Sequence, residues 1–468
     1  MKKLAIVFCV ILILACAFSP VPAFSADTDF VVSDSVLLSY TGNSESVTVP
    51  SSVTAIASNA FLNNTTIKSI KLHDKVYTIG DKAFYGCTSL SAISGGKGVK
   101  YVGALSFVDT EFLSSSTDEF VTLGSVLLCY NGTSSSVALP DSVTCVAPYA
   151  FLRNTKLASF KAGSNLRTIG EGAFYECSAL STVSVKNSVS FIGADAFKGT
   201  KWLSSKTGFV TLGDGILVAY NGNSTSVKIP STVKQLAPNA FYSNTTITSV
   251  DVPSSVFAIG ARAFMSCSNL TDVSLSYGLV MIDDEAFANC SKLKNIATPM
   301  TLSKIGKGAF INCTKLTQAE LQGSALSIDY GAFAYCSNLE LAFISNSAVA
   351  VGDDVFCNDT KLSFVTAPSD LLVISPDTFS GVETLTVLCD KDSFAHSALK
   401  GAFDISFSRG DVGLDGELDI LDATVIQRHI ACIETLPVEK LAFADADFDA
   451  TVSVFDATYI QRYIAKLL

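Results

Sequence analysis

The amino-acid sequence predicts a solenoid of stacked coils followed by a small helical module. A phenylalanine recurs at steps of 23 or 44 residues along most of the chain. Leu or Ile stands six residues after each of these thirteen phenylalanines, and Ile, Val or Leu stands five residues before each. Near the end of the chain, Asp422–Ala431 returns as Asp456–Ala465 with only two changes. The recurring phenylalanines are Phe61, Phe84, Phe107, Phe151, Phe174, Phe197, Phe241, Phe264, Phe287, Phe310, Phe333, Phe356 and Phe379.

The first 26 residues have the pattern of a secretory signal peptide. Lys2 and Lys3 precede an apolar run that ends at Ala17, and small residues follow before Asp27. The run is shorter than the roughly 18 apolar residues that a membrane span needs. One alternative stays open, because the segment that ends at Cys16 resembles a bacterial lipoprotein cleavage site. We therefore expect a secreted, extracellular protein, with membrane attachment only if Cys16 carries a lipid.

Each coil is expected to contain two short strands and one compact turn. In the coil of Phe84, residues 88–93 alternate like a strand, and residues 76–80 predict a second strand. Gly80 marks the entry into residues 81–87, for which we expect one helical turn. A single coil cannot bury its own apolar side chains, so coils stacked at roughly 4.8 Å would build parallel sheets around a continuous core.

A longer repeat lies over the coils. The stretch that starts at Phe120 returns at Phe209, and Tyr40, Tyr130 and Tyr220 lie ninety residues apart. Each 44-residue step therefore holds two coils, the first of them divergent. The three tyrosines fit an exposed aromatic row and a packing position equally well.

The coil resembles the BspA-like class of bacterial leucine-rich repeats, with its pattern IG..AF..C..L..I..P. The resemblance covers about Phe30 to Phe407 and implies a leucine-rich-repeat solenoid over residues 27–407, closed at about residues 385–407 by a cap of strand, short helix and strand. We then interpret the residues three positions after the phenylalanines as structural side chains rather than disulfide or metal partners. These are the cysteines and, in the same place in other coils, Asn64, Asn154 and Asn244.

The solenoid shows no catalytic motif. His73, His396 and His429 share no ligand-like spacing, and neither a zinc-protease motif nor a nucleophile elbow occurs. No basic patch suggests nucleic acid. We therefore expect a non-catalytic binding or display surface for a protein or glycan ligand. The alternative is an enzyme whose active site lies in the divergent coils near Trp202, the only tryptophan.

The C-terminal sixty residues have the oxygen-ligand spacing of two calcium loops. Oxygen-bearing residues recur at positions 1, 5, 7, 9 and 12 of two twelve-residue segments, each followed by an apolar-periodic helix, which predicts two calcium ions. Two solvated acidic turns would not predict carboxylates in the same register twice. Gly413 removes a ligand at position 3, and Ala450 stands where glycine is favoured, so both sites are expected to be weaker than typical. The candidate ligands are Asp411, Asp415, Glu417, Asp419, Asp422, Asp445, Asp447, Asp449, Thr451, Ser453 and Asp456.

The duplicated loop–helix units closely resemble a type I dockerin, the module that attaches cellulosome components to cohesins. We place it at residues 408–468. The resemblance implies that the two near-identical helices can present either face to one cohesin of a scaffoldin. For Ile420 and Val454 the alternative is packing within the module. The positions that the resemblance assigns to the partner are Ile420, Leu421, Gln427, Arg428, Val454, Phe455, Gln461 and Arg462.

The whole chain is thus expected to be a display protein of a cell-surface, cellulosome-type complex that takes part in polysaccharide catabolism. Its alternatives remain a dockerin-borne enzyme and a lipid-anchored surface adhesin.

Overall fold

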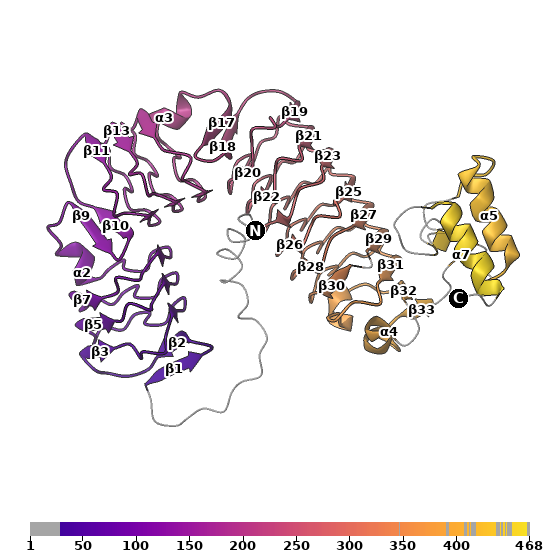
Figure 1. The fold of residues 1–468 in the computed structure, drawn as a ribbon, viewed down its shortest axis with the longest axis horizontal. Helices are drawn as coiled ribbons and strands as arrows, with labels where there is room; N and C mark the ends of the chain where they lie inside the picture. Colours follow the sequence, from indigo (N-terminus) through magenta and orange to yellow (C-terminus); the bar gives the residue numbers. More distant parts are fainter. Residues whose placement is uncertain are drawn as a thin grey trace. The chain divides into compact units, whose positions relative to one another are not determined.

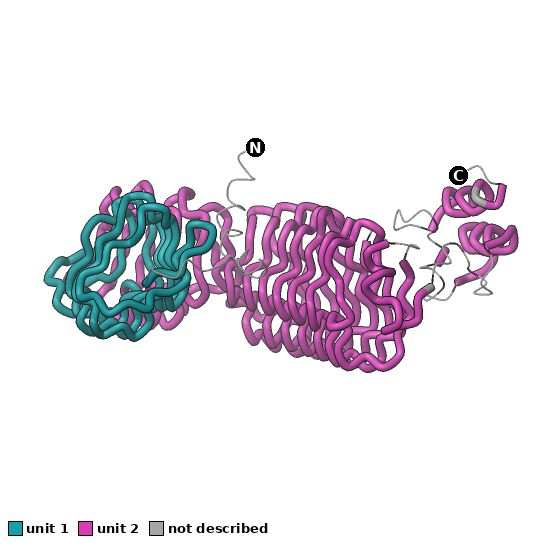
Figure 2. The backbone as a smooth tube through the Cα atoms, turned by 90° about the horizontal axis from the view of Figure 1, so that it is seen from below, with its two compact units in different colours: residues 1–132, 145–150 teal, residues 133–144, 151–468 magenta. Residues whose placement is uncertain are grey.

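The structure is a computed structural model that describes residues 29–345, 347–389, 393–406, 410, 412, 418–436, 440, 443–444, 446 and 452–465. The predicted signal peptide and the lipidation of Cys16 lie outside these residues. The chain forms two compact units, Met1–Gly132 with Cys145–Ala150 and Thr133–Thr144 with Phe151–Leu468 (Figure 2). Among the described helices, none is long and apolar enough to cross a bilayer.

Unit 1 is a stack of coils in which each regular coil gives one strand to each of two parallel sheets. Successive strands pair with a shift of 23 residues, as in Ser46↔Ser69 and Ser69↔Ala92. In the divergent stretches, β1 and β9 instead pair antiparallel with β2 and β10. The elements are β1 (Phe30–Ser33), β2 (Val36–Tyr40), β3 (Ser46–Thr48), β4 (Ala55–Ile56), β5 (Ser69–Leu72), β6 (Thr78–Ile79), β7 (Ala92–Gly95), β8 (Tyr101–Val102), α2 (Glu111–Ser114), β9 (Phe120–Leu123), β10 (Val126–Tyr130) and β12 (Cys145–Val146).

Unit 2 continues the same construction over many more coils (Figure 1). Its longest sheet has eight strands in the order β17-β18-β20-β22-β24-β26-β28-β30. A six-stranded sheet, which we call the outer sheet, has the order β25-β27-β29-β31-β32-β33. The solenoid elements are β11 (Ser136–Ala138), β13 (Ser159–Lys161), β14 (Thr168–Ile169), β15 (Thr182–Ser184), β16 (Phe191–Ile192), α3 (Lys201–Ser204), β17 (Gly208–Leu212), β18 (Ile216–Asn221), β19 (Ser226–Lys228), β20 (Gln235–Leu236), β21 (Ser249–Val252), β22 (Ala258–Ile259), β23 (Asp272–Leu275), β24 (Met281–Ile282), β25 (Asn295–Ala297), β26 (Lys304–Ile305), β27 (Gln318–Leu321), β28 (Leu326–Ile328), β29 (Leu341–Ile344), β30 (Ala348–Val351), β31 (Phe364–Ala367), η1 (Pro376–Phe379), β32 (Thr386–Cys389), α4 (Phe394–Leu399) and β33 (Asp404–Ser406).

The recurring phenylalanines form aromatic stacks in the core of each unit. Phe264 and Phe287 have ring centroids 5.0 Å apart, and Phe287 and Phe310 have centroids 5.1 Å apart with nearly parallel rings. Tyr40 and Tyr220 extend these stacks, with their centroids 5.3 Å and 5.1 Å from those of Phe61 and Phe241. Of the two possibilities for the tyrosines, the structure therefore favours packing over an exposed row.

The turn around each phenylalanine differs from the expected helical turn. In the coil of Phe84, Lys82 and Gly86 have positive φ values of 53° and 70°. The N–H groups of Lys82, Phe84 and Gly86 donate to carbonyls of the next coil, at 2.9, 2.8 and 3.1 Å. Because these inter-coil bonds take N–H groups that an α-helix would use internally, the segment folds as a ladder of turns. Twelve coils, those of Phe61 to Phe356, share the left-handed pair two residues before and two residues after the phenylalanine.

Other local expectations are adjusted in detail. β7 begins at Ala92, because the start of the expected strand at residues 88–89 is part of a turn. β6 covers Thr78–Ile79. Gly80 is required by close packing, since a Cβ there would overlap with the backbone nitrogen of Ser58 in the preceding coil. Glycine therefore stands at this turn because the backbone of the preceding coil leaves no room for a side chain.

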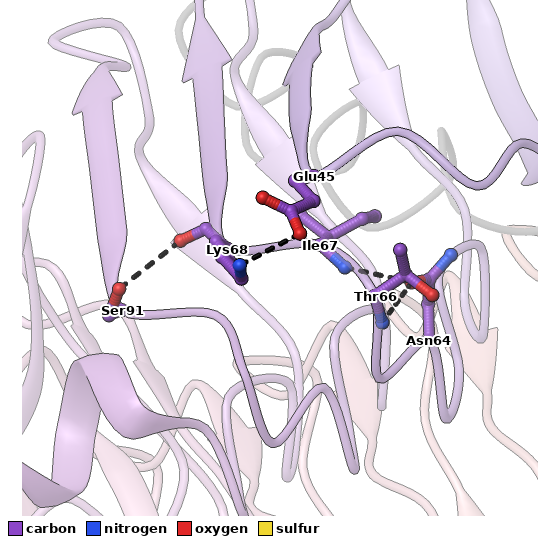
Figure 3. Close-up of polar contacts among 6 residues, drawn as sticks. All are labelled: Glu45, Asn64, Thr66, Ile67, Lys68 and Ser91. Atoms are coloured by element: carbon purple, nitrogen blue, oxygen red, sulfur yellow. Dashed lines mark hydrogen bonds and ion pairs between the residues drawn. The ribbon is translucent and has the colours of Figure 1, made fainter.

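The position three residues after the phenylalanine is structural in every regular coil. Cys290 donates its thiol hydrogen to the carbonyl of Phe264, one coil earlier, at a Sγ–O distance of 3.2 Å. Asn64 instead accepts the N–H groups of Thr66 and Ile67, each at 3.1 Å (Figure 3). The same thiol-to-carbonyl contact recurs for Cys87, Cys177, Cys267, Cys313 and Cys336, all of which are buried and form no disulfide.

The end of the chain changes from coils to helices. After β32, α4 and β33, the helices α5 (Ile420–Ile430) and α7 (Val454–Ile464) pack against each other. Their shared core contains Ala423 and Ile426 from α5 and Ala457 and Ile460 from α7. Equivalent residues of the two repeats, 34 positions apart, thus meet in one small core.

Candidate functional site

The first helix of the C-terminal module begins at a well-defined cap. The Asp419 carboxylate accepts the N–H of Leu421 at 2.6 Å, and Asp422 Oδ2 accepts the N–H of Asp419 at 3.0 Å. This reciprocal arrangement is a capping box, which satisfies N–H groups that a helix start would otherwise leave without partners. The predicted loop positions 9 and 12 therefore lie side by side at the start of α5.

The second helix repeats this start with one substitution. Asp456 Oδ2 accepts the N–H of Ser453 at 2.7 Å, and Ser453 Oγ accepts the N–H of Phe455 at 3.1 Å. A serine hydroxyl thus does at α7 what the Asp419 carboxylate does at α5. The two helix starts are equivalent, as the sequence repeat predicts.

Two carboxylates of this module are buried. Asp422 is 3% exposed and Asp456 is 0% exposed. Burying a carboxylate is costly unless it is hydrogen-bonded, paired or bound to a cation. Their oxygen chemistry, beside Asp419 and Ser453, suits a hard cation such as calcium.

The rest of the predicted ligand set lies outside the described residues. Within the described part of the chain, no three His, Cys, Asp or Glu side chains gather as a metal-binding group. The calcium-ligand assignment therefore stays a prediction. The predicted ligands outside the described residues are Asp411, Asp415, Glu417, Asp445, Asp447, Asp449 and Thr451.

Each helix of the module starts with an exposed apolar pair. Ile420 and Leu421 are 54% and 64% exposed, and Val454 and Phe455 are 60% and 71% exposed. Packing within the module, the alternative for Ile420 and Val454, does not account for this exposure. Solvent-exposed apolar side chains that recur at equivalent places suggest a surface that a partner covers.

The predicted polar contact positions are also on the surface. Gln427, Arg428, Gln461 and Arg462 are all exposed. Arg428 already has an intramolecular partner, because its Nε lies 3.1 Å from the Glu434 carboxylate. Glu434 could not be singled out from the sequence, because it lies beyond the end of α5 and its pairing depends on the turn that follows that helix.

The comparison with protein families decides what the coils are. The chain matches the BspA type leucine rich repeat region, in six copies, over residues 34–122, 115–204, 218–291 and 258–386. The chain belongs to this family. Residues 409–465 match the dockerin type I domain. The predicted combination of a leucine-rich-repeat solenoid and a type I dockerin is therefore confirmed.

Solved structures with a similar chain are leucine-rich-repeat proteins of other bacteria. A leucine rich cell surface protein from Faecalibacterium prausnitzii A2-165 is 24% identical, with a TM-score of 0.28, and the match covers 74% of this chain and 95% of that one. The pneumococcal vaccine antigen PcpA is 19% identical, with a TM-score of 0.32 and coverage of 79% and 91%. A leucine-rich repeat protein from Eubacterium ventriosum ATCC 27560 is 19% identical, with a TM-score of 0.33 and coverage of 74% and 88%. The search of curated proteins finds no match.

The family assignment gives the C-terminal module its partner class. A type I dockerin binds calcium and a cohesin, so this is a dockerin-bearing leucine-rich-repeat protein for cohesin binding. The exposed pairs of α5 and α7 belong to the dockerin, and the BspA-type match covers residues 34–204 and 218–386.

Two open hollows lie on the BspA-type coils of unit 1. One is lined by residues between Ser39 and Thr66, and a second by residues between Asn63 and Ser114. Trp202, near which the alternative enzyme site was expected, is 6% exposed and packs on Phe197 with ring centroids 4.9 Å apart. Its ring extends the core stack, which is a structural role.

Proposed function

We propose that the protein is a secreted, non-catalytic display protein, which its dockerin attaches to a cellulosome-type scaffold by calcium-dependent binding to a cohesin. The observation that carries this proposal is the duplicated exposed apolar pair at the starts of α5 and α7, within a dockerin. Two equivalent surfaces on one small module support a partner that can be engaged through either helix. The solenoid, proposed to span residues 27–407, then presents its surface to a protein or glycan ligand.

We propose that two calcium ions order the dockerin, which we place at residues 408–468. The buried Asp422 and Asp456 are the described residues best placed to contribute, with Asp419 and Ser453 beside them. A cation would offset the cost of burying these carboxylates. The proposed ligands are Asp411, Asp415, Glu417, Asp419, Asp422, Asp445, Asp447, Asp449, Thr451, Ser453 and Asp456.

The test is calorimetric titration of the full-length protein against a panel of cohesins, with calcium and again with chelator. Leu421→Ser and Phe455→Ser are made singly and together, and Ile433→Ser, an exposed apolar residue beyond α5, is the matched control. If either helix can be used, each single variant binds within a few-fold of wild type. The double variant loses roughly 100-fold in affinity, because each truncation removes a desolvated contact.

Three results would overturn this proposal. Binding that survives chelator removes the calcium dependence, and a double variant that binds like Ile433→Ser removes the proposed surface. Turnover of polysaccharides or peptides by the solenoid removes the non-catalytic role. Mass spectrometry of the mature N-terminus tests secretion separately: a start near Asp27 supports it, and an acylated Cys16 replaces it with lipid anchoring.

A further inference from the structure

The outer sheet of unit 2 changes its chemistry at its C-terminal end. The outward positions of β27 are polar, namely Gln318 and Glu320. Two register steps replace these residues with apolar ones, because Gln318 pairs with Leu341 and Glu320 with Phe343. Leu341 in turn pairs with Phe364, which keeps the position apolar. One strand further, Leu388 pairs with Thr366. We call Leu341, Phe343, Phe364 and Leu388 the terminal apolar patch; β29, β31 and β32, which carry it, are neighbours in the sheet (Figure 1).

A residue of the dockerin segment covers this patch. The ring of Phe443 lies 5.2 Å from that of Phe364, and the two residues are each only 6% exposed. Phe443, Phe364 and Leu388 form one cluster, against which Leu341 and Phe343 also pack. This cluster is separate from the core of the dockerin, to which the next residue, Ala444, belongs. Phe443 thus faces away from its own module.

A backbone hydrogen bond links Phe443 to the first residues of the dockerin. Gly410 donates its N–H to the Phe443 carbonyl at 2.9 Å. Phe443 stands two residues before Asp445, the first proposed ligand of the second calcium loop, and between them Ala444 is fully buried. Phe443 is therefore separated from the proposed second calcium loop by a single buried residue.

We propose that the terminal apolar patch is an intramolecular docking site for the dockerin, with Phe443 as its anchor, and that calcium strengthens the docking. The calcium step rests on the proposed function. Phe443 is the occupant because it packs on the patch. Without it, outward-facing Leu and Phe side chains would be exposed on a sheet whose preceding strand, β27, carries polar residues at these positions. Leu421 and Phe455 stay 64% and 71% exposed in this arrangement, so docking leaves the cohesin surface accessible.

The docking is tested by hydrogen exchange on the full-length protein, with calcium. The variants are Phe443→Ser, Phe364→Thr, which restores a polar outward residue, and the double variant. Removing Phe443 raises exchange in β31 and β32 by roughly tenfold or more, since a buried Phe side chain contributes at least that factor. Phe364→Thr gives a similar rise, and the double variant adds little to either, because the two residues act in one contact. The control Leu372→Ser, 70% exposed and outside the patch, leaves this exchange unchanged.

Two further measurements separate docking from alternatives. Chelator reproduces the effect of Phe443→Ser on β31 and β32 in wild type and adds little in the variant. Cohesin affinity of Phe443→Ser stays within about twofold of wild type, so a failure of docking and a failure of the proposed function are distinguishable. Unchanged exchange in Phe443→Ser overturns the proposal. So does a wild-type dimer that Phe364→Thr dissociates in sedimentation, because a second copy would then occupy the patch.

Discussion

The solenoid and the dockerin both arise from sequence repetition, but they use the repeated residues in opposite ways. In the solenoid, each repeated side chain contacts its own copy one coil away, as Phe287 does with Phe264 and Phe310. In the dockerin, the repeated pair at the start of each helix, such as Leu421 and Phe455, stays exposed. Repetition with a constant register shift therefore buries the repeated residues, whereas packing α5 against α7 leaves part of the repeat exposed.

The difference has a consequence for stability. A coil of the solenoid gains apolar contacts from neighbours on both sides, so that stability rises with the number of coils. Among its described residues, the dockerin has one pair of helices, α5 and α7, with a small core of a few residues such as Ala423, Ile426 and Ile460. Modules of this size commonly need a metal ion or a disulfide. The two regions should therefore respond differently to the same perturbation.

Calcium removal is expected to have the largest effect and to act on one region only. With chelator, the buried carboxylates of Asp422 and Asp456 lose their proposed cation, and α5 and α7 unfold. The solenoid has no such requirement and keeps its sheet signal. Circular dichroism during chelator titration of the full-length protein measures both. The contrast between the two regions would not hold if the dockerin kept its helices in chelator, or if the solenoid unfolded together with the dockerin.

Asp359 is a local exception to the regular coils. It stands three residues after Phe356, where most other coils place Cys, Asn or Thr, and it is fully buried. Oδ1 accepts the N–H of Cys336 at 2.7 Å, whereas Oδ2 has no hydrogen-bond partner. Burial raises the pKa of this carboxyl to about 8, although the N–H bond from Cys336 lowers it.

The raised pKa makes solenoid stability depend on pH. The folded state keeps the proton of Asp359 up to about pH 8, whereas the unfolded chain loses it near pH 4. The contribution of Asp359 to stability is therefore highest below pH 4, falls as the pH rises towards 8 and is level above that, with a total fall on the order of 5 kcal/mol. Urea unfolding of the solenoid at pH 5 and pH 9 measures the fall.

Asp359→Asn is the matched variant for this prediction. Asn occupies the equivalent position after Phe61 and cannot ionise. The variant should unfold at nearly the same urea concentration at both pH values, while wild type is less stable at pH 9. Equal pH dependence in the two proteins would show that Asp359 does not carry the effect.

Sequence alone predicted the repeated framework because stacking makes every coil obey the same constraints. Phe264 and Leu270, six residues apart, recur in the following coils at steps of 23 residues, and this recurrence places both the core and the coil period. The prediction of a helical turn around Phe84 was wrong in detail, because it considered the residues of one coil in isolation. What decides its form are the N–H groups of Lys82 and Phe84, which bond to the next coil.

The candidate site was predictable to a different extent. Residues 420–421 and 454–455 could be placed at helix starts because the repeat fixes their loop register. Their exposure could not be read from the sequence, because an apolar pair at a helix start is as easily buried. The contact of Phe443 with Phe364 could not be predicted from the sequence either, because it joins the dockerin segment to a strand nearly eighty residues earlier.

The aromatic stack can be weakened at one coil. Phe287→Ala removes a ring that is 0% exposed and has stacked neighbours on both sides. We expect a loss of about 3–5 kcal/mol in the free energy of unfolding, from lost transfer energy and from the cavity that remains. Leu372→Ser, at an exposed residue, should change it by less than about 0.5 kcal/mol. Urea unfolding followed by fluorescence of the buried Trp202 compares the two; equal midpoints would argue against a continuous core.

The cysteines give the mildest contrast, because it concerns reactivity rather than stability. Cys432, in the dockerin, is exposed, whereas Cys267 in the solenoid is buried and donates to the Phe241 carbonyl at 3.2 Å. Burial raises the pKa of the Cys267 thiol to about 12, so that only about one molecule in ten thousand carries the reactive thiolate at pH 8. Iodoacetamide should therefore label Cys432 in the native protein and leave Cys267 unlabelled until urea unfolds the coils. Mass spectrometry of the digested protein measures both sites. Early labelling of Cys267 would mean that its coil opens readily, and that the solenoid lacks the coil-to-coil stability on which the comparison with the dockerin depends.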